Sequence, residues 1–345
     1  MSTIANRRWV LAAYPKGIPD ASAWRLEEVP VPRPGPRQIL VRARYLSVDP
    51  YMRGRMAEGA NYAASVRIGE TMHGGGVGEV VASEHPDWRP GDIAESMAFG
   101  WQEYAVLSPD RTGPGGTHRI DPGLAPIESA LSWLGMPGMT AYFGLLETAR
   151  VRAGDTVLVS AASGAVGQIV GQLAKIAGAR AVAVAGSQRK LAWCREIGCD
   201  ATIDYKASGD LLAAVREACP NGVDVFFDNT GGPIQDAAMK SLAIGARVVI
   251  CGRIAQAARF GEPEMGERLL GSLIVSRASV HGFLVFDWYH RREEALARLA
   301  AWGREGRLRF REDVLDGIER MPDAFLRLLD GSNFGKQLVR IAPPA

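Results

Sequence analysis

The pattern of hydrophobic and polar positions divides the chain into two parts. From Arg7 to Ser108 the apolar runs are short and strand-like, and clusters of proline and glycine separate them. Such runs predict an irregular β domain, built as a compact barrel or sandwich. The predicted strands of this part lie at residues 8–14, 38–48, 77–83, 92–97 and 103–108.

After Glu128 the pattern changes to strand-like and helical segments in alternation. A continuous apolar run at 156–161 predicts a buried parallel strand, and the apolar residues of 166–176 share one helical face. The same order recurs as 180–187 with 188–198, 201–206 with 211–220, and 223–230 with 234–243, before a last run at 247–253. Strands alternating with helices of about 10 to 15 residues predict parallel βαβ units in a doubly wound sheet, an α/β fold. The final segment breaks this rhythm with a strand-like tail, which we expect to return to the first domain.

The turn after the first of these strands, "SAASGAVG", has the features of a dinucleotide-binding loop. Ala162 stands at the first glycine position of G-x-G-x-x-G, and Gly164 and Gly167 stand at the other two. Glycines there allow the backbone to approach a pyrophosphate, and the following helix N-terminus favours its negative charge. The alternative is a merely tight turn. The position between a buried strand and an amphipathic helix favours a cofactor site, which would include Ala165 and Val166.

The end of the second strand indicates which cofactor this would be. An NAD site places an acidic residue there for the ribose hydroxyls. The stretch "AGSQRK" has no acid and offers Ser187, Arg189 and Lys190 instead. These groups suit a ribose 2′-phosphate, although the two cations also have a plain interpretation as solvated residues. Because cations in the first turn of a helix oppose its dipole, a nearby anion explains them better, and we predict NADP.

Composition narrows the remaining function classes. The 345 residues are 47% hydrophobic and 23% charged, with a formal net charge of +2. These values are typical of a two-domain globular protein in the cytoplasm, without a secretory signal or membrane helix, and they argue against nucleic acid as a partner. Cysteine is absent before Cys194, and the histidines of the first part lack ligand spacing, so we expect no bound metal.

Several motifs, taken in order, resemble one known family. They are "DPYMRGRM", "LGMPGMTAYFGLLE", "SAASGAVGQIVGQLAK", "AGSQRK", "DYK", "FFDNTGG", "ICGRI", "GFLVF" and "NFGKQLV". The chain is similar, from about residue 6 to residue 341, to the zinc-independent medium-chain dehydrogenase/reductases. The branch is that of leukotriene B4 12-hydroxydehydrogenase, prostaglandin reductase and bacterial curcumin reductase. The resemblance implies a GroES-like substrate domain over 1–128 with a return segment at 310–345, a Rossmann NADP-binding domain over 129–309, and a homodimer.

The same resemblance implies roles for individual residues. Gly164 to Gly167 would bind the pyrophosphate, and Lys190 the 2′-phosphate. The other cofactor contacts that it implies are Tyr205 near the adenosine, Asn229, Cys251 and the backbone of Phe283, Leu284 and Val285 on the nicotinamide side, and Asn333 from the tail.

The implied reaction is NADPH-dependent reduction of the carbon–carbon double bond of an α,β-unsaturated carbonyl compound. Hydride reaches the β-carbon, and donors to the carbonyl oxygen stabilise the developing charge. The branch carries a Tyr-Asn pair for this purpose, where this chain has Ala257 and Ala258. We expect Tyr51 to act as the donor; the alternatives are the ribose hydroxyl with water, or a changed substrate range. Tyr51 also has a plain interpretation as an aromatic anchor after Pro50. A quinone reductase and a non-catalytic NADPH-binding protein remain rival functions.

Overall fold

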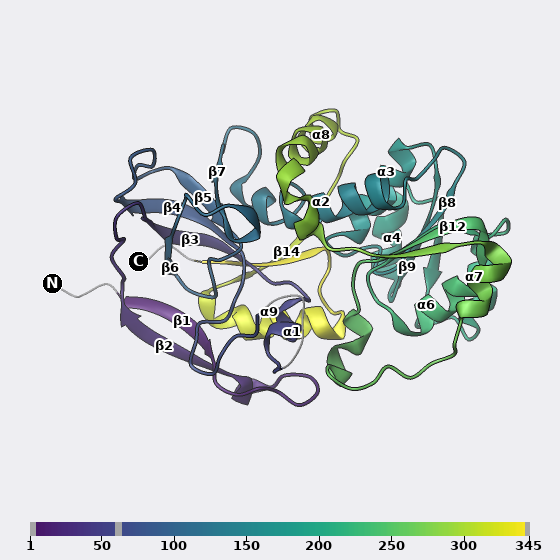
Figure 1. Cartoon of the computed structure of the whole chain (residues 1–345), viewed down its shortest axis with the longest axis horizontal. Coiled ribbons are helices and arrows are strands. Elements are labelled where there is room, and N and C mark those ends of the chain that lie inside the picture. Colours follow the sequence, from purple (N-terminus) through teal and green to yellow (C-terminus); the bar gives the residue numbers. More distant parts are fainter. Residues whose placement is uncertain (1–4, 59–63, 342–345) are drawn as a thin grey trace.

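The computed structural model describes residues 5–58 and 64–341 and contains two large sheets. Figure 1 shows them side by side, with β3 to β7 at the left and the parallel strands at the right. The strands at the left and the hairpin beside them are β1 (Ala5–Leu11), β2 (Trp24–Pro30), β3 (Ile39–Ser47), β4 (Gly76–Ser83), β5 (Ile93–Ser96), β6 (Tyr104–Leu107), β7 (Thr117–Ile120), β14 (Glu312–Asp316) and β15 (Lys336–Arg340). The division into a β part and an α/β part confirms the predicted fold class.

The first sheet has the order β14-β15-β3-β4-β5-β7, and β6 pairs with β3. Its central strand β3 is antiparallel to β4, with register shifts after Leu40 and after Ala43. β1 and β2 form a separate antiparallel hairpin. Neither β2 nor β7 is among the strands predicted from the sequence. In β2 the apolar pattern is weak, because the strand contains consecutive glutamates and most of its residues are not buried.

The C-terminal segment returns to this first sheet. β15 is antiparallel to β3, and β14 is parallel to β15. Between them α9 (Met321–Asp330) places Met321, Ala324 and Phe325 in the same hydrophobic core as Trp101. The segment therefore ties the end of the chain to the strand that leads into residues 48–56 (Figure 1).

The second sheet has six parallel strands in the order β10-β9-β8-β11-β12-β13. They are β8 (Thr156–Val159), β9 (Arg180–Ala185), β10 (Ala201–Asp204), β11 (Val223–Asp228), β12 (Leu242–Ile250) and β13 (Ser279–Gly282). This arrangement confirms the predicted doubly wound sheet, with the chain order reversing between β8 and β11, where ligands bind in open α/β sheets.

Helices cover both faces of this second sheet. The helices of the chain before α9 are α1 (Met52–Arg55), α2 (Met136–Tyr142), α3 (Gly167–Ile176), α4 (Gln188–Glu196), α5 (Leu211–Ala218), α6 (Gly232–Met239), α7 (Leu270–Ser276) and α8 (Arg292–Arg304). Residues of α2, α3 and α8 share one core, and residues of α5 and α6 share another. Short helical turns lie at η1 (Ala21–Ala23), η2 (Gly113–Gly115), η3 (Ile127–Leu131), η4 (Phe143–Thr148), η5 (Ile254–Arg259), η6 (Val285–Arg291) and η7 (Ile318–Arg320). Among the described residues, no helix has the length and apolar character that a membrane crossing requires.

Candidate functional site

The loop between β8 and α3 makes a tight turn that depends on Gly167. A Cβ atom on Gly167 would lie 2.4 Å from the carbonyl oxygen of Ala161 and 2.7 Å from Cα of Ala162. Ala161 itself has a left-handed backbone with φ 48°, whereas Ala162 is outside the left-handed region. Alanine at the first motif position therefore carries no backbone strain, and the strained residue is its predecessor. Gly164, Ala165 and Val166 lie in this turn, directly before α3. The turn places the N-terminus of α3 at the carboxyl edge of the sheet, where its N–H groups could bind an anion.

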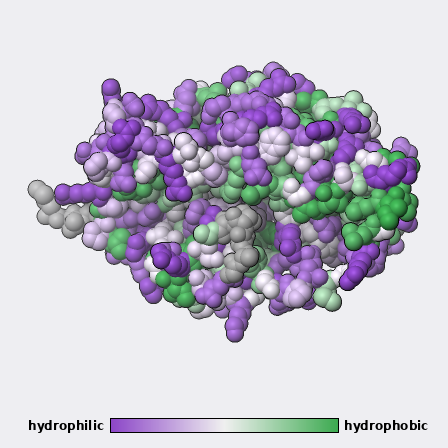
Figure 2. Space-filling model, viewed as in Figure 1, coloured by the Kyte–Doolittle hydropathy of each residue, from purple (hydrophilic) through white to green (hydrophobic). Residues whose placement is uncertain are grey.

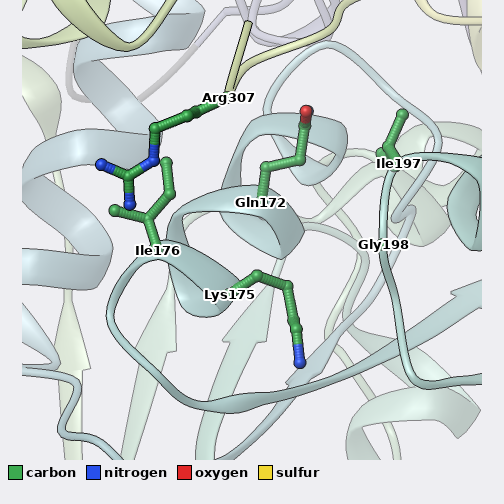
Figure 3. A pocket seen from close by; sticks show the side chains of 6 residues that line it. All are labelled: Gln172, Lys175, Ile176, Ile197, Gly198 and Arg307. Atoms are coloured by element: carbon green, nitrogen blue, oxygen red, sulfur yellow. The ribbon is translucent and has the colours of Figure 1, made fainter. Parts of the chain in front are cut away.

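The opposite end of α3 carries a surface hollow. It has a volume of about 260 Å³, and Figure 3 shows it lined by Gln172, Lys175, Ile176, Ile197, Gly198 and Arg307. Lys175 forms an ion pair there with Asp200, at 2.8 Å. Because this is the C-terminal, electronegative end of the helix, the hollow does not suit a phosphate. The N-terminal end of α3 is the end whose dipole would favour a phosphate.

The adenosine end of the predicted site is built from β9, α4 and the residues after β10. Ser187 caps α4, and its Oγ accepts a hydrogen bond from the Lys190 N–H at 3.4 Å. A Cβ atom on Gly186 would lie 2.7 Å from the Tyr205 ring and 3.0 Å from the Lys206 side chain. Glycine at this position therefore lets Tyr205 and Lys206 close over the strand end.

The side chains of Lys190 and Lys206 are close enough at this strand end for their charges to interact. Burial, and then the charge of Lys206, lower the pKa of Lys190. Tyr205 is 40% exposed, and Lys206 Nζ lies 5.9 Å from the centre of its ring. Two cations beside an exposed aromatic ring form a suitable environment for a phosphate dianion and an adenine. The sequence analysis did not single out Lys206, although it directly follows Tyr205 in "DYK".

Arg189 and Lys190 also contact the returning C-terminal segment. Lys190 Nζ donates a hydrogen bond to the Gly331 carbonyl at 2.6 Å. The Arg189 guanidinium lies 4.7 Å from the Phe334 ring centre, and Arg311 lies 4.3 Å from it. The neighbouring Asn333 is buried, and its Nδ2 donates to the Gly335 carbonyl. Through these contacts Arg189 and Lys190 of α4 lie close to the segment that contains Asn333.

The nicotinamide-side residues gather at the carboxyl ends of β8, β11, β12 and β13. Asn229 follows β11, and its Nδ2 donates to the Ser160 carbonyl at 2.8 Å. Cys251 follows β12, and burial raises the pKa of its thiol to about 12, so it stays protonated. The Phe283 N–H donates to the Ile250 carbonyl at 3.1 Å, which orders the backbone toward Leu284 and Val285.

A buried carboxylate, missed in the sequence analysis, holds this edge together. Asp228 is fully buried and accepts hydrogen bonds from Ser160 Oγ, Thr230, the Gly231 N–H and Gln235 Nε2. A network in which each donor has a charged acceptor fixes the strand ends relative to one another. The sequence could have indicated Asp228, because it is an acidic residue at the end of the apolar run "VDVFFD". No local sequence pattern indicates the role of Ser160.

Tyr51 lies on the first domain, directly before α1. Its hydroxyl is 3.3 Å from Nδ1 of His73, and the Arg55 guanidinium is 5.6 Å from its ring centre. Burial, and then the charges of Arg55 and Arg111, lower the pKa of His73 to about 4. The imidazole is therefore neutral at pH 7, with one ring nitrogen as a hydrogen-bond donor and the other as an acceptor.

The segment with Ala257 and Ala258 contacts the first domain. Ala257 is buried within η5, and the Arg53 guanidinium lies 5.1 Å from the ring centre of Phe260 just after it. Arg53 also donates to the Gly17 carbonyl at 2.9 Å, and a Cβ on Gly17 would lie 3.5 Å from the Ala258 oxygen. The first domain thus packs against the segment that holds Ala257 and Ala258.

The described part of the chain has no cluster of three or more histidine, cysteine or acidic side chains suited to a metal ion. The three histidines of the first part have separate surroundings. His73 faces Tyr51, His85 lies 3.1 Å from Asp110, and the His118 ring lies 6.4 Å from Tyr289. These three side chains therefore do not converge on one another in the described part of the chain.

Comparisons with known proteins agree with this architecture. Residues 7–113 match a family described as the N-terminal domain of oxidoreductase, and residues 165–301 match one described as zinc-binding dehydrogenase. The NADPH-dependent curcumin reductase of Escherichia coli is 40% identical, over 98% of this chain and 97% of its own length. The NADP-dependent 2-alkenal reductase of Nicotiana tabacum is 37% identical, over 98% of both chains.

A solved structure shows the same likeness in three dimensions. CurA from Vibrio vulnificus in complex with NADPH is 39% identical and superimposes with a TM-score of 0.90, over 98% of this chain and all of the other. The likeness therefore includes both domains and the return segment. The chain belongs to the medium-chain dehydrogenase/reductases, in the branch that contains the curcumin, 2-alkenal and prostaglandin reductases.

Proposed function

We propose that this chain catalyses the NADPH-dependent reduction of the carbon–carbon double bond of α,β-unsaturated carbonyl compounds, namely enones and 2-alkenals. One observation carries the proposal: relatives with these activities match the chain over nearly its whole length. A structural neighbour of similar identity binds NADPH. The chain is accordingly an oxidoreductase that acts on an activated C=C bond.

The residues of this chain fit NADPH. Gly164 and Gly167 allow the tight turn that brings the N-terminus of α3 to the carboxyl edge of the sheet, and no acidic residue directly follows β9 to repel a 2′-phosphate. We propose that the phosphate lies between Ser187, Arg189, Lys190 and Lys206, with the adenosine against Tyr205. Asn229, Cys251 and the backbone of 283–285 would hold the nicotinamide side, and Asn333 would approach from the return segment.

The bound cofactor supplies a hydride for the β-carbon of the substrate. This leaves negative charge on the carbonyl oxygen, and a proton then adds to the α-carbon. We propose Tyr51 as a hydrogen-bond donor to that oxygen, its hydroxyl turning to the substrate from His73 Nδ1, which lies 3.3 Å away. A donor placed in advance stabilises the enolate more than the uncharged substrate, which is what accelerates the reaction.

Turnover assays test the proposed function directly. The purified protein is mixed with NADPH and separate enones, 2-alkenals and quinones, and the loss of nicotinamide absorbance is followed. Reduction of enones and alkenals supports the proposal. Turnover confined to quinones favours a quinone reductase, and NADPH binding without turnover of any acceptor favours a non-catalytic protein.

Lys190 provides a prediction about cofactor choice. Lys190→Ala is expected to lower kcat/KM for NADPH by about 10- to 100-fold, because a charge-assisted bond to the phosphate is lost. The value for NADH, which has no 2′-phosphate, should hardly change. The ratio of the two kcat/KM values measures the effect. Lys240→Ala, which removes a lysine paired with Glu267 on the far side of α6, is the matched control. An unchanged ratio in Lys190→Ala contradicts the phosphate assignment.

We also propose that the protein is a homodimer that binds no zinc. Among the described residues, the edge strand β13 pairs with β12 alone. Several residues in and around β13 are apolar and exposed. Figure 2 shows this hydrophobic area at the end of the molecule where α7 lies. Its members are Ile244, Leu270, Ile274, Val275 and Val280. Analytical ultracentrifugation tests the proposal, and a monomer at micromolar concentration would contradict it.

A further inference from the structure

On the cofactor domain, the loop after β12 offers no side-chain hydroxyl that could assist Tyr51 in stabilising the carbonyl oxygen of the substrate. Ala257 and Ala258 have no polar side-chain atoms, and Tyr51 belongs to the opposite domain. A donor on the cofactor domain keeps its distance from the nicotinamide site whether the two domains are open or closed. The following inference rests on the proposed function and concerns which residue supplies that donor.

We propose that the hydroxyl of Tyr289 replaces the missing tyrosine and donates a hydrogen bond to the carbonyl oxygen of the substrate. Tyr289 lies in η6, four residues after Val285, the last residue of the segment expected at the nicotinamide. Its side chain faces the first domain, since its hydroxyl lies 3.1 Å from the sulfur of Met97 and its ring lies 6.4 Å from that of His118. η2 of the first domain also packs against η6. The residue thus spans the boundary between the two domains.

The hydroxyl of Tyr289 has only a weak partner within the described chain. A thioether sulfur is a poor hydrogen-bond acceptor, so Tyr289 loses little when it exchanges Met97 for a carbonyl or enolate oxygen. By contrast, the Tyr51 hydroxyl faces an imidazole nitrogen, a strong acceptor. A third tyrosine, Tyr142 of α2, donates a hydrogen bond to the carboxylate of Glu294 at 3.1 Å. Of these three hydroxyls, that of Tyr289 is the least costly to redirect.

The surroundings keep Tyr289 in its donor form. Burial, and then the negative charge of Glu95, raise the pKa of Tyr289 well above its usual range, and the charge of Arg292 only partly offsets them. Glu95 is itself buried, and its pKa is raised to about 7. A small hollow bordered by Asp49, Glu95, Met97 and Met136 lies beside the Met97 sulfur. The phenol therefore remains neutral at physiological pH.

Tyrosine-to-phenylalanine variants test this inference. Tyr289→Phe is expected to lower kcat/KM for an enone such as 4-phenyl-3-buten-2-one by about 10- to 100-fold, the cost of one oxyanion donor. The second readout does not depend on turnover: the Kd of the same enone for the protein saturated with NADP⁺, from tryptophan fluorescence, should rise several-fold. The Kd for NADPH and the Tm should stay at their wild-type values. Tyr142→Phe, which removes a hydroxyl bonded to Glu294, is the matched control and should retain wild-type kinetics.

A compensating variant separates catalysis from packing. If Tyr289 replaces the missing group, Ala257→Tyr in the Tyr289→Phe background should restore most of the lost kcat/KM, with no such gain in Tyr51→Phe. Wild-type kinetics in Tyr289→Phe, a parallel loss of NADPH affinity, or no restoration by Ala257→Tyr in a folded, NADPH-binding protein would each overturn the inference. Absence of turnover in the wild-type protein would instead contradict the proposed function, and the enone Kd would still report on Tyr289.

Discussion

Gly167→Ala is expected to weaken NADPH binding by about 100-fold or more, because a displacement near 1 Å in a binding loop has an effect of that order. The added Cβ would lie 2.4 Å from the Ala161 oxygen and 2.7 Å from Cα of Ala162. Both are backbone atoms, so the turn itself has to move. Such a shift takes the N–H groups at the start of α3 away from the pyrophosphate. Fluorescence titration with NADPH measures the change.

A second glycine variant provides the control for Gly167→Ala. Gly271 lies inside α7, where an added Cβ would meet no atom within 4 Å. Gly271→Ala should leave NADPH affinity unchanged and stabilise the helix by about 1 kcal/mol. Far-UV circular dichroism of both variants shows whether they fold. A folded Gly167→Ala protein with wild-type affinity would contradict the close approach that we assign to this turn.

The parallel sheet was predictable because its strands are buried on both faces. All four residues of β8 are buried, and β9 and β11 are buried along nearly their whole length. Such strands need continuous apolar runs, which are visible in a single sequence. The motif before α3 was predictable for a related reason: the loop depends on local backbone geometry, and glycine spacing records that geometry directly.

The strands that escaped prediction take their structure from distant partners. β14 has the sequence "EDVLD" with two exposed positions and pairs with β15, and β13 is a four-residue edge strand beside β12. Short strands with polar or exposed residues have no periodicity of their own, because cross-strand contacts rather than local propensity stabilise them. Pairing between segments far apart in sequence decides their conformation.

The same distinction holds for the candidate site. Ser187 and Lys190 could be predicted as cofactor ligands because they follow a strand at a known distance. The bond from Lys190 to the Gly331 carbonyl joins positions 141 residues apart, and the bond from Ser160 to Asp228 joins positions 68 apart. No local spacing encodes such contacts. The contact between Tyr289 and Met97 could not be predicted for this reason too, since it requires the two domains to be in place.

Lys336→Met is expected to destabilise the protein by about 3 to 5 kcal/mol, the usual cost of breaking a buried ion pair. Lys336 is 1% exposed, and its Nζ donates to the Asp49 carboxylate and, at 3.0 Å, to the Val48 carbonyl. Asp49 is also buried and accepts from Ser47 Oγ. Methionine fills a similar volume but leaves the carboxylate without its cation. Urea unfolding gives the free-energy difference.

Two further variants show whether the pair itself is responsible. Lys336→Met combined with Asp49→Asn should recover a large part of the loss, because no unpaired charge remains. Lys175→Met removes an exposed pair with Asp200 and should cost less than about 1 kcal/mol. Equal stability of the single and double Lys336 variants would contradict the pairing argument. The Asp49 carbonyl accepts from the Met52 N–H in the turn that carries Tyr51. The single variant should therefore also lower kcat, since the loss of Lys336 loosens the return segment and this turn together.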